Sequence, residues 1–418
     1  MTQGKDKAVS PRERICVVVH AWPRLSMTFV AQELVGLEQE GLDLWIATWG
    51  TPDKIRHPIH DQLKASVHRL PKGADAFRRL VQAWREVRHT KGYVEARSLF
   101  WNEFRKDPTK RKLRAFARGI ILAAEMPKDI RAIYVHFIGS SATVARYVSM
   151  ITGLPLAASA HARDIWTSSE ADIRAKLAAM KWCATCTTIG ADHLRTLTDA
   201  DDKIHLIHHG LSFERFPADI PVRSGASGSN PDEPVKLLSV GRAVEKKGFD
   251  ILLEALAGLP ADLHWYWTQI GDGKIIDKLR RRADELGLSG RIDWLGARDQ
   301  RAVIELYRSS DLFVLPCREA SDGDRDGLPN VLMEAQSQGL ACLSTDFSEI
   351  PELIIDGETG VLVPPAEVEP LRSALERLMR SPDERDRLGR AGYDRVRTRF
   401  ESESGISKIA MLLRQIMR

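Results

Sequence analysis

Cysteine is scarce in this chain, and long apolar runs are absent from it. The 418 residues include five cysteines, spread thinly and odd in number, which suits a reducing cytosol better than a disulfide framework. No run of about 18 apolar residues occurs, so no membrane-spanning helix is expected. Residues 1–14 are polar and charged, so no signal peptide is expected either. These features predict a cytoplasmic protein.

A strong excess of one charge is also missing. The 61 basic and 57 acidic side chains leave a net charge of only +4, so nucleic acid is not an expected partner. Cys183 and Cys186 have the spacing of half a zinc site, but no second Cys or His pair completes a set in the sequence. We expect a half-buried strand at 185–189 there instead.

Apolar runs of strand length alternate with amphipathic helical stretches along the chain. This alternation predicts an α/β protein with parallel, doubly wound sheets, and the length suffices for two domains with separate cores. Residues 217–234 are rich in Pro, Gly, Ser and Asp and lack a hydrophobic period, which predicts a linker. It separates a first domain at 1–216 from a second at 235–399. The expected strands are 15–20, 44–48, 132–136, 156–159, 185–189 and 204–207, then 237–240, 263–270, 292–295, 312–315, 341–344 and 360–363.

The most informative segment runs from Asp326 to Glu334. Gly327, Leu328 and Pro329 follow the first carboxylate and open an apolar helical pattern, with Pro329 expected at the first helical position. The N-terminus of such a helix attracts phosphate through its unpaired N–H groups and its dipole. Glu334 is expected ~7 Å further along the axis at ~1.5 Å per residue, within reach of sugar hydroxyls attached to that phosphate. A buried helix with an acidic cap is the alternative.

Two cations follow another expected strand. Arg242 and Lys247 come after the apolar run 235–240 and before a helical pattern. They are therefore expected at the carboxyl end of a strand, where open α/β sheets bind ligands. Arg offers a rigid fork to phosphate oxygens and Lys a mobile point charge. The segment predicts a phosphate clamp.

These segments resemble the family 4 retaining glycosyltransferases of the GT-B fold. The resemblance rests on Gly-Arg and Lys-Gly at 241–242 and 247–248, Ile-Gly-Asp-Gly at 270–273, the apolar strand at 311–316, the segment 326–334 and Glu-Ile-Pro-Glu-Leu at 349–353. It implies two Rossmann-like domains facing across a cleft, with the final helix, 400–418, packed back on the first domain. It also implies that a sugar is moved from a nucleotide-diphosphate sugar without a metal ion or other cofactor.

The resemblance implies a role for several of these residues. The cations and the helix N-terminus are expected to hold the diphosphate, and Glu334 the ribose hydroxyls. Asp326 stands beside the transferred sugar, where the family usually has Glu. His161 lies in Ala-His-Ala-Arg-Asp-Ile at 160–165, where the family's His contacts the donor sugar; a core histidine is the alternative. The implied catalytic residues are His161 and Asp326, and the implied donor-binding residues are Arg242, Lys247, Gly327, Leu328, Pro329 and Glu334.

The first half carries a weaker match, to the members of that family that build exopolysaccharides. Trp-Pro-Arg-Leu-Ser-Met-Thr-Phe at 22–29 resembles their Phe-Pro-x-x-Ser-Glu-Thr-Phe opening. This implies an acceptor-side loop with Arg24, Ser26 and Thr28. Ser26 or Thr28 could instead only cap a helix. His209 stands in a further matching segment, where the family has Asn.

An acidic loop could suggest a metal ion. Asp322, Asp324 and Asp326 occupy positions one, three and five of a calcium-loop pattern, with Gly327 following. Position twelve is Met333, however, so the bidentate carboxylate is lost. Arg325 inside the loop also disfavours a cation. We therefore expect no metal site.

Residues 78–118 carry thirteen Lys or Arg against four Glu or Asp, with aromatic residues interleaved. This pattern fits either a solvated helical insertion or a surface attracted to anionic lipid. The second reading suits an enzyme with a lipid-linked glycan acceptor, working as a peripheral protein on the cytosolic face of a membrane. The sequence thus predicts a glycosyltransferase of surface polysaccharide biosynthesis. A nucleotide-sugar-binding protein without transfer activity, and an epimerase or phosphorylase on the same fold, are the alternatives.

Overall fold

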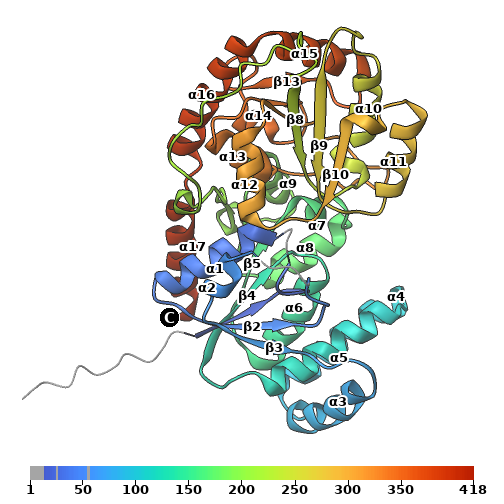
Figure 1. The fold of residues 1–418 in the computed structure, drawn as a ribbon. Helices are drawn as coiled ribbons and strands as arrows, with labels where there is room; N and C mark the ends of the chain where they lie inside the picture. Colours follow the sequence, from blue (N-terminus) through green and yellow to red (C-terminus); the bar gives the residue numbers. More distant parts are fainter. Residues whose placement is uncertain (1–13, 25–26, 54–56) are drawn as a thin grey trace, which may run out of the picture.

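A computed structural model describes residues 14–24, 27–53 and 57–418. It contains two parallel sheets, each covered by helices, one above the other in Figure 1. The first has seven strands in the order β3-β2-β1-β4-β5-β6-β7. These are β1 (Arg14–Val18), β2 (Asp43–Thr48), β3 (Ser66–Arg69), β4 (Ile130–His136), β5 (Leu156–Ala160), β6 (Trp182–Thr185) and β7 (Ile204–Leu206). The second has six strands in the order β10-β9-β8-β11-β12-β13. These are β8 (Val235–Val240), β9 (Trp265–Ile270), β10 (Ile292–Gly296), β11 (Leu312–Leu315), β12 (Cys342–Thr345) and β13 (Val361–Val363).

Helices cover both faces of the sheets, which explains why most strands are continuous apolar runs. The first domain contains α1 (Thr28–Gln39), α2 (Ile59–Gln62), α3 (Gly73–Val87), α4 (Lys91–Lys106), α5 (Lys110–Glu125), α6 (Ser140–Thr152), α7 (Ala162–Trp166), α8 (Glu170–Ala179) and α9 (Thr188–Arg195). The second contains α10 (Phe249–Ala257), α11 (Ile276–Glu285), α12 (Gln300–Ser309), α13 (Asn330–Ser337), α14 (Ile350–Leu353), α15 (Val368–Arg380) and α16 (Pro382–Arg399), and the chain ends with α17 (Ser402–Met417). The predicted α/β class with two doubly wound parallel sheets is confirmed.

Both sheets reverse their strand order beside a central strand. The reversal lies between β1 and β4 in the first sheet and between β8 and β11 in the second. Ligands of open α/β sheets bind outside the carboxyl ends of the strands at such a switch point. The loops after β8 and β11 carry the segments 241–248 and 316–329, which contain most of the predicted donor-binding residues.

One predicted strand was misplaced and one strand was missed. The strand expected at 185–189 is β6, Trp182–Thr185, and helix α9 begins at Thr188. The Thr187 side chain caps that helix by accepting from the Gly190 N–H at 3.3 Å. The β-branched residues 187–189 therefore begin a helix instead of continuing a strand. Strand β3 was missed, because it is an edge strand with exposed or half-buried polar residues rather than an apolar run.

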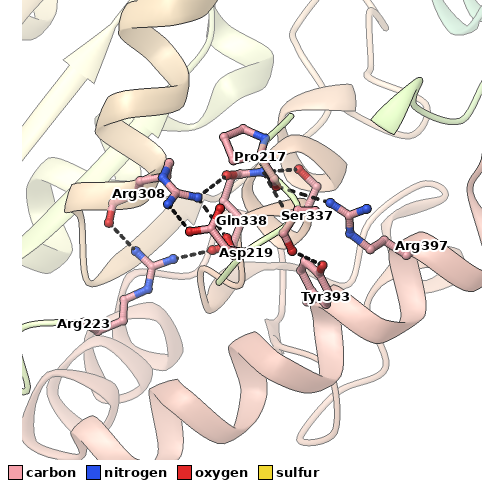
Figure 2. Close-up of polar contacts among 9 residues, drawn as sticks. Pro217, Asp219, Arg223, Arg308, Ser337, Gln338, Tyr393 and Arg397 are labelled. Carbon is pink, nitrogen blue, oxygen red and sulfur yellow. Dashed lines mark hydrogen bonds and ion pairs between the residues drawn. The ribbon is translucent and has the colours of Figure 1, made fainter. Parts of the chain in front are cut away.

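The segment predicted as a linker is anchored on the second domain. The Arg223 guanidinium donates to backbone carbonyls, including that of Ser310 at 2.5 Å and that of Gln338 at 2.7 Å. The Gln338 side chain in turn donates to the Pro217 carbonyl at 3.3 Å. Figure 2 shows the contacts of Gln338 with Arg223 and Pro217, together with those of Arg308 on α12 and Arg397 on α16 with the same segment. Ala226 of this segment, and Leu211 and Phe216 just before it, belong to the hydrophobic core of the second domain.

Helix α17 lies against the first domain, next to α1, at the opposite end of the sequence (Figure 1). Ile409, Ala410 and Leu413 are part of the core around β1 and β2. A Cβ built on Gly36 of α1 would lie 2.6 Å from Ile406 Cδ1. The two helices therefore approach closely because α1 has glycine at this position.

Candidate functional site

The loops after β8 and β11 meet in a cluster of two ammonium groups and two carboxylates. Lys247 Nζ lies 2.6 Å from Asp326 Oδ2, and Lys246 Nζ lies 3.0 Å from Asp326 Oδ1. Lys246 also binds Asp324 Oδ1 at 3.1 Å. Burial opposes ionisation of Asp326, but Lys247 and Lys246 outweigh it and hold the pKa of that carboxyl well below its usual range. Asp326 is therefore an anion with two cationic partners.

A glycine places these lysines. Gly248 has φ 66°, and a Cβ on it would lie 1.9 Å from the Pro316 carbonyl oxygen. Only glycine allows the backbone after β8 to pass this close to the backbone after β11. Burial lowers the pKa of Lys247, but the charge of Asp326 outweighs it and raises that pKa; Arg242, earlier in the same loop with an exposed side chain, opposes the rise weakly by charge repulsion. Both predicted cations therefore lie on one side of the switch point.

Helix α13 begins one residue later than predicted. Pro329 is its N-cap, with ψ 117°, and Asn330 is the first helical residue. Leu328 packs against the core of the second domain. Glu334 lies on α13 and accepts a hydrogen bond from the Tyr307 hydroxyl at 3.1 Å. Burial raises the pKa of Glu334, and the nearby charge of Arg215 offsets part of that rise.

Arg215 was not predicted as a site residue. Its guanidinium donates to Gln32 Oε1 of α1 at 2.6 Å, and Gln32 donates to the Gly210 carbonyl at 3.2 Å. Arg215 thus connects the first domain with the neighbourhood of Glu334. Its interdomain role depends on contacts between residues 183 positions apart, which no local motif reveals.

In the first domain, His161 follows β5 and is buried among aromatic rings. Its ring centroid lies 4.4 Å from that of Phe137 and 4.9 Å from that of Phe29. Phe137 has the left-handed φ of 73°, a strained backbone of the kind found at functional sites. Burial lowers the pKa of His161 well below its usual range, with the neighbouring His209 and His136 adding to the effect. His161 is therefore a neutral imidazole at physiological pH.

A buried carboxylate lies behind this imidazole. Glu33 Oε1 accepts from the Tyr134 hydroxyl at 2.7 Å and lies 3.4 Å from His136 Nε2. Burial alone raises the pKa of Glu33, but the charges of His136 and His209 reverse the direction and lower it. The network fixes the ring stack that contains His161, in which His136 and His161 are nearly parallel at 13°.

The two halves of the site are in contact. A Cβ on Gly327 would lie 3.2 Å from Thr187 Cγ2 and 3.6 Å from Ala162 Cβ, the residue after His161. The Thr188 N–H donates to Glu352 Oε1 at 3.1 Å. The structure thus places the loop of Asp326 opposite the loop of His161, with little space between Gly327 and Thr187.

Of the predicted acceptor-side residues that the structure describes, only Thr28 lies next to this contact. Thr28 is the first residue of α1, and Met27 is the N-cap; the adjacent Phe29 packs on His161. Arg24 forms an ion pair with Asp53 at 3.3 Å. Ser26 lies outside the described residues.

The arrangement combines cations able to hold phosphate with a neutral imidazole and an ionised carboxylate able to hold sugar hydroxyls. Residues 225–395 match the family model described as Glycosyl transferases group 1. The chain contains a glycosyl transferases group 1 domain. Among the helices of the described residues, none has the length and apolar character needed to cross a bilayer.

The relatives of this group 1 domain include enzymes of bacterial polysaccharide synthesis. The chain is 29% identical to the amylovoran biosynthesis glycosyltransferase AmsK of Erwinia amylovora over 51% of each chain. It is 28% identical to the putative colanic acid biosynthesis glycosyltransferase WcaL of Salmonella typhimurium over 54% of each. The match therefore spans about half the length of these curated relatives.

Solved structures show the same fold over nearly the whole chain. The Anabaena protein Alr3699/HepE in complex with UDP and glucose matches with a TM-score of 0.68 at 14% identity. The match covers 96% of this chain and all of that one. The GT-B fold predicted from the sequence is therefore confirmed for the first domain as well as for the group 1 domain.

Proposed function

We propose that the protein is a retaining glycosyltransferase that moves a sugar from a nucleotide-diphosphate sugar to a growing, lipid-linked glycan of a surface polysaccharide. The observation that carries this proposal is the contact between the Asp326 loop and the His161 loop. It brings a cluster of cations and carboxylates at the switch point of the second sheet against a buried imidazole at the carboxyl end of β5. The UDP and glucose bound to a protein of the same fold support a nucleotide-sugar donor.

On the donor side, the diphosphate binds between Arg242, Lys247 and the backbone N–H groups of Gly327, Leu328 and Asn330, with Pro329, which has no N–H, holding the turn between them. A lysine ammonium has three donors, so Lys247 can bind phosphate while it remains paired with Asp326. Glu334 binds the ribose hydroxyls from α13. Leu328, which packs against the core, fixes the loop that approaches the phosphates.

At the sugar, His161 and Asp326 bind hydroxyl groups from opposite domains. The acceptor hydroxyl attacks the anomeric carbon on the face from which the phosphate leaves. A new carbon–oxygen bond forms as the bond to the β-phosphate oxygen breaks, and the hydroxyl proton passes to the departing phosphate. The lysines and Arg242 stabilise the charge that develops on that phosphate, and we propose that no metal ion is needed.

The acceptor side includes the loop of Arg24, Ser26 and Thr28 and the surface of α3, α4 and α5. These helices project from the first domain away from the second (Figure 1). They expose large apolar side chains, which most soluble proteins bury: Phe77, Trp84, Val94, Trp101 and Leu113. A peripheral position on the cytosolic face of a membrane follows from this proposal.

Donor turnover tests the proposal against its alternatives. A thermal-shift screen with nucleotides and nucleotide sugars identifies the donor, because a ligand that binds the native state raises its stability. Release of nucleoside diphosphate that depends on a lipid-linked glycan acceptor supports transfer. Binding without turnover would instead indicate a binding protein. An epimerised free sugar would indicate an epimerase, and a pyridoxal phosphate absorbance band would indicate a phosphorylase.

A further inference from the structure

Three potential metal ligands lie together at the edge of the first sheet. His161 follows β5, Cys186 follows β6 and His209 follows β7. One ligand atom from each residue lies within 4.8 Å of the other two, and this is the only group of three potential ligands found among the described residues. The sequence conceals the group, because the three residues are far apart and only the strand order brings them together.

The geometry suits a small tetrahedral ion. His161 Nδ1 and His209 Nε2 lie 3.4 Å apart, close to the separation of two nitrogens that bind the same zinc ion at ~2.0–2.1 Å. The ligand atom of Cys186 lies within 4.8 Å of both histidine ligand atoms, so its thiol has to move towards them to form a zinc–thiolate bond of ~2.3 Å. The set contains two nitrogens and one sulfur, which zinc prefers over the oxygen ligands of magnesium or calcium.

Two buried side-chain atoms around the cluster accept or donate no hydrogen bond among the described residues. His161 is 7% exposed, and its Nε2 has no hydrogen-bond partner among the described residues. Glu33 Oε2 also has none, and it lies 3.8 Å from His209 Nδ1. A carboxylate behind the second nitrogen of a histidine is the usual support for a histidine that binds a metal.

We propose that His161, Cys186 and His209 bind one divalent transition-metal ion of the zinc type, with the fourth coordination position open. The Cys186 thiol gives its proton to solvent when it binds, because the thiolate is the ligand. The ion does not serve the transfer reaction. It occupies the imidazole that the proposed function assigns to the donor sugar, so bound metal inhibits transfer.

Cobalt binding tests the site without any assay of activity. The full chain, free of affinity tag and stripped of metal, is titrated with Co²⁺, whose thiolate complexes absorb strongly in the near ultraviolet. We expect one equivalent to produce that band and Zn²⁺ to displace it. Cys186→Ser removes the band. His209→Asn weakens the affinity for Co²⁺ by at least 10–100-fold, because loss of a hydrogen-bond partner of a metal ligand already costs that much.

Matched variants separate the cluster from its neighbours. Cys183→Ala removes a cysteine of the adjacent strand β6, and His205→Asn removes a histidine of β7; both keep the band. Thermal unfolding checks that each variant is folded, and His209→Asn decides the question if Cys186→Ser does not fold. A band that is absent from the wild type, survives in Cys186→Ser or disappears in Cys183→Ala would overturn the site.

Inhibition is a separate measurement, because it rests on the proposed function. We expect Zn²⁺ to lower donor turnover at least tenfold and EDTA to restore it. Cobalt binding without any loss of turnover would overturn the overlap with the donor sugar. A metal-free wild type with no turnover counts against the proposed function alone, since the cobalt spectrum reports the metal site independently.

Discussion

Lys247 Nζ lies 2.6 Å from Asp326 Oδ2, so the lysine predicted to bind phosphate already has an anionic partner. Asp326 has a second ammonium partner, Lys246, at 3.0 Å. Lys246 also pairs with Asp324 at 3.1 Å, so two ammonium groups face two carboxylates, and the exposed Arg242 adds a further positive charge beside the switch point. The pair also fixes the direction of the Lys247 side chain before any substrate arrives, which is the preorganisation that electrostatic catalysis requires.

Removal of either clamp cation should reduce turnover, but only one removal should affect stability. We expect Arg242→Ala and Lys247→Ala each to lower kcat by on the order of 100-fold, or ~3 kcal/mol. Arg242 is exposed, so its variant should unfold at the wild-type temperature. Lys247→Ala removes a buried partner of Asp326 and should cost ~1–3 kcal/mol of stability. The exposed Arg281→Ala on α11 is the control, and near-wild-type turnover in both clamp variants would contradict the assignment.

Glu334 should contribute to nucleotide affinity rather than to chemistry. Glu334→Gln keeps the shape of the side chain but weakens hydrogen bonds to ribose, so nucleoside diphosphate should bind ~1–3 kcal/mol more weakly. Isothermal calorimetry measures the loss. Glu305→Gln on the exposed side of α12 should leave the affinity unchanged. Equal affinities of Glu334→Gln and the wild type would remove Glu334 from the ribose site.

The same carboxyl should affect the pH dependence of stability. Burial raises the pKa of Glu334 in the folded protein above its unfolded value of ~4.3. The folded state therefore binds the proton more tightly, and stability falls as pH rises from the unfolded pKa through the folded one. Denaturant unfolding should show that Glu334→Gln gains stability relative to the wild type over this window. A difference that stays constant with pH would show that burial does not penalise this charge.

The sequence predicted the strands that are apolar and the loops that carry motifs, because both signals are local. Strand β3 escaped because it lies at the edge of the sheet and is polar. The start of helix α9 was not predicted, because the β-branched Thr187 and Thr188 favour a strand. Only the structure shows that the Thr187 hydroxyl caps the helix by accepting from the Gly190 N–H. For the site, the sequence placed Lys247 at a strand end and Asp326 in front of a helix, and the structure adds that the two side chains form an ion pair.

Contacts between distant segments could not be predicted in this way. Arg215 and Gln32 are connected by the packing of two domains, and His161 and His209 by the order of strands β5 to β7. Each of these pairs consists of ordinary polar residues in unrelated motifs. A single sequence contains no local signal for such pairs.

Transfer should not need a metal ion. Of the three aspartates in the calcium-loop pattern, Asp324 and Asp326 are paired with lysine. A divalent cation would have to displace those ammonium groups. Turnover should therefore persist in excess EDTA, measured as release of nucleoside diphosphate. If EDTA abolishes turnover and magnesium or manganese restores it, the carboxylates of this loop bind metal after all.

The basic helices of the first domain combine charge with exposed apolar groups. Trp84 of α3 and Leu113 of α5 line one open apolar hollow. Lys110, Arg111 and Arg114 on α5 are exposed, whereas Lys112 is held by Asp107 at 3.0 Å. Cations near an anionic leaflet gain ~1 kcal/mol each, and the apolar side chains add burial in the interface.

Membrane association through α3 to α5 should therefore depend on both charge and salt. We expect the protein to float with anionic vesicles at low salt and to be released as salt shortens the ~10 Å Debye length at 0.1 M. Reversal of Lys110, Arg111 and Arg114 to Glu should release it while nucleotide binding stays intact. Reversal of three exposed cations on α11 of the other domain, Lys278, Arg280 and Arg281, is the matched control and should change nothing. Equal flotation with neutral vesicles, or no flotation with either kind, would show that these helices form only a solvated face.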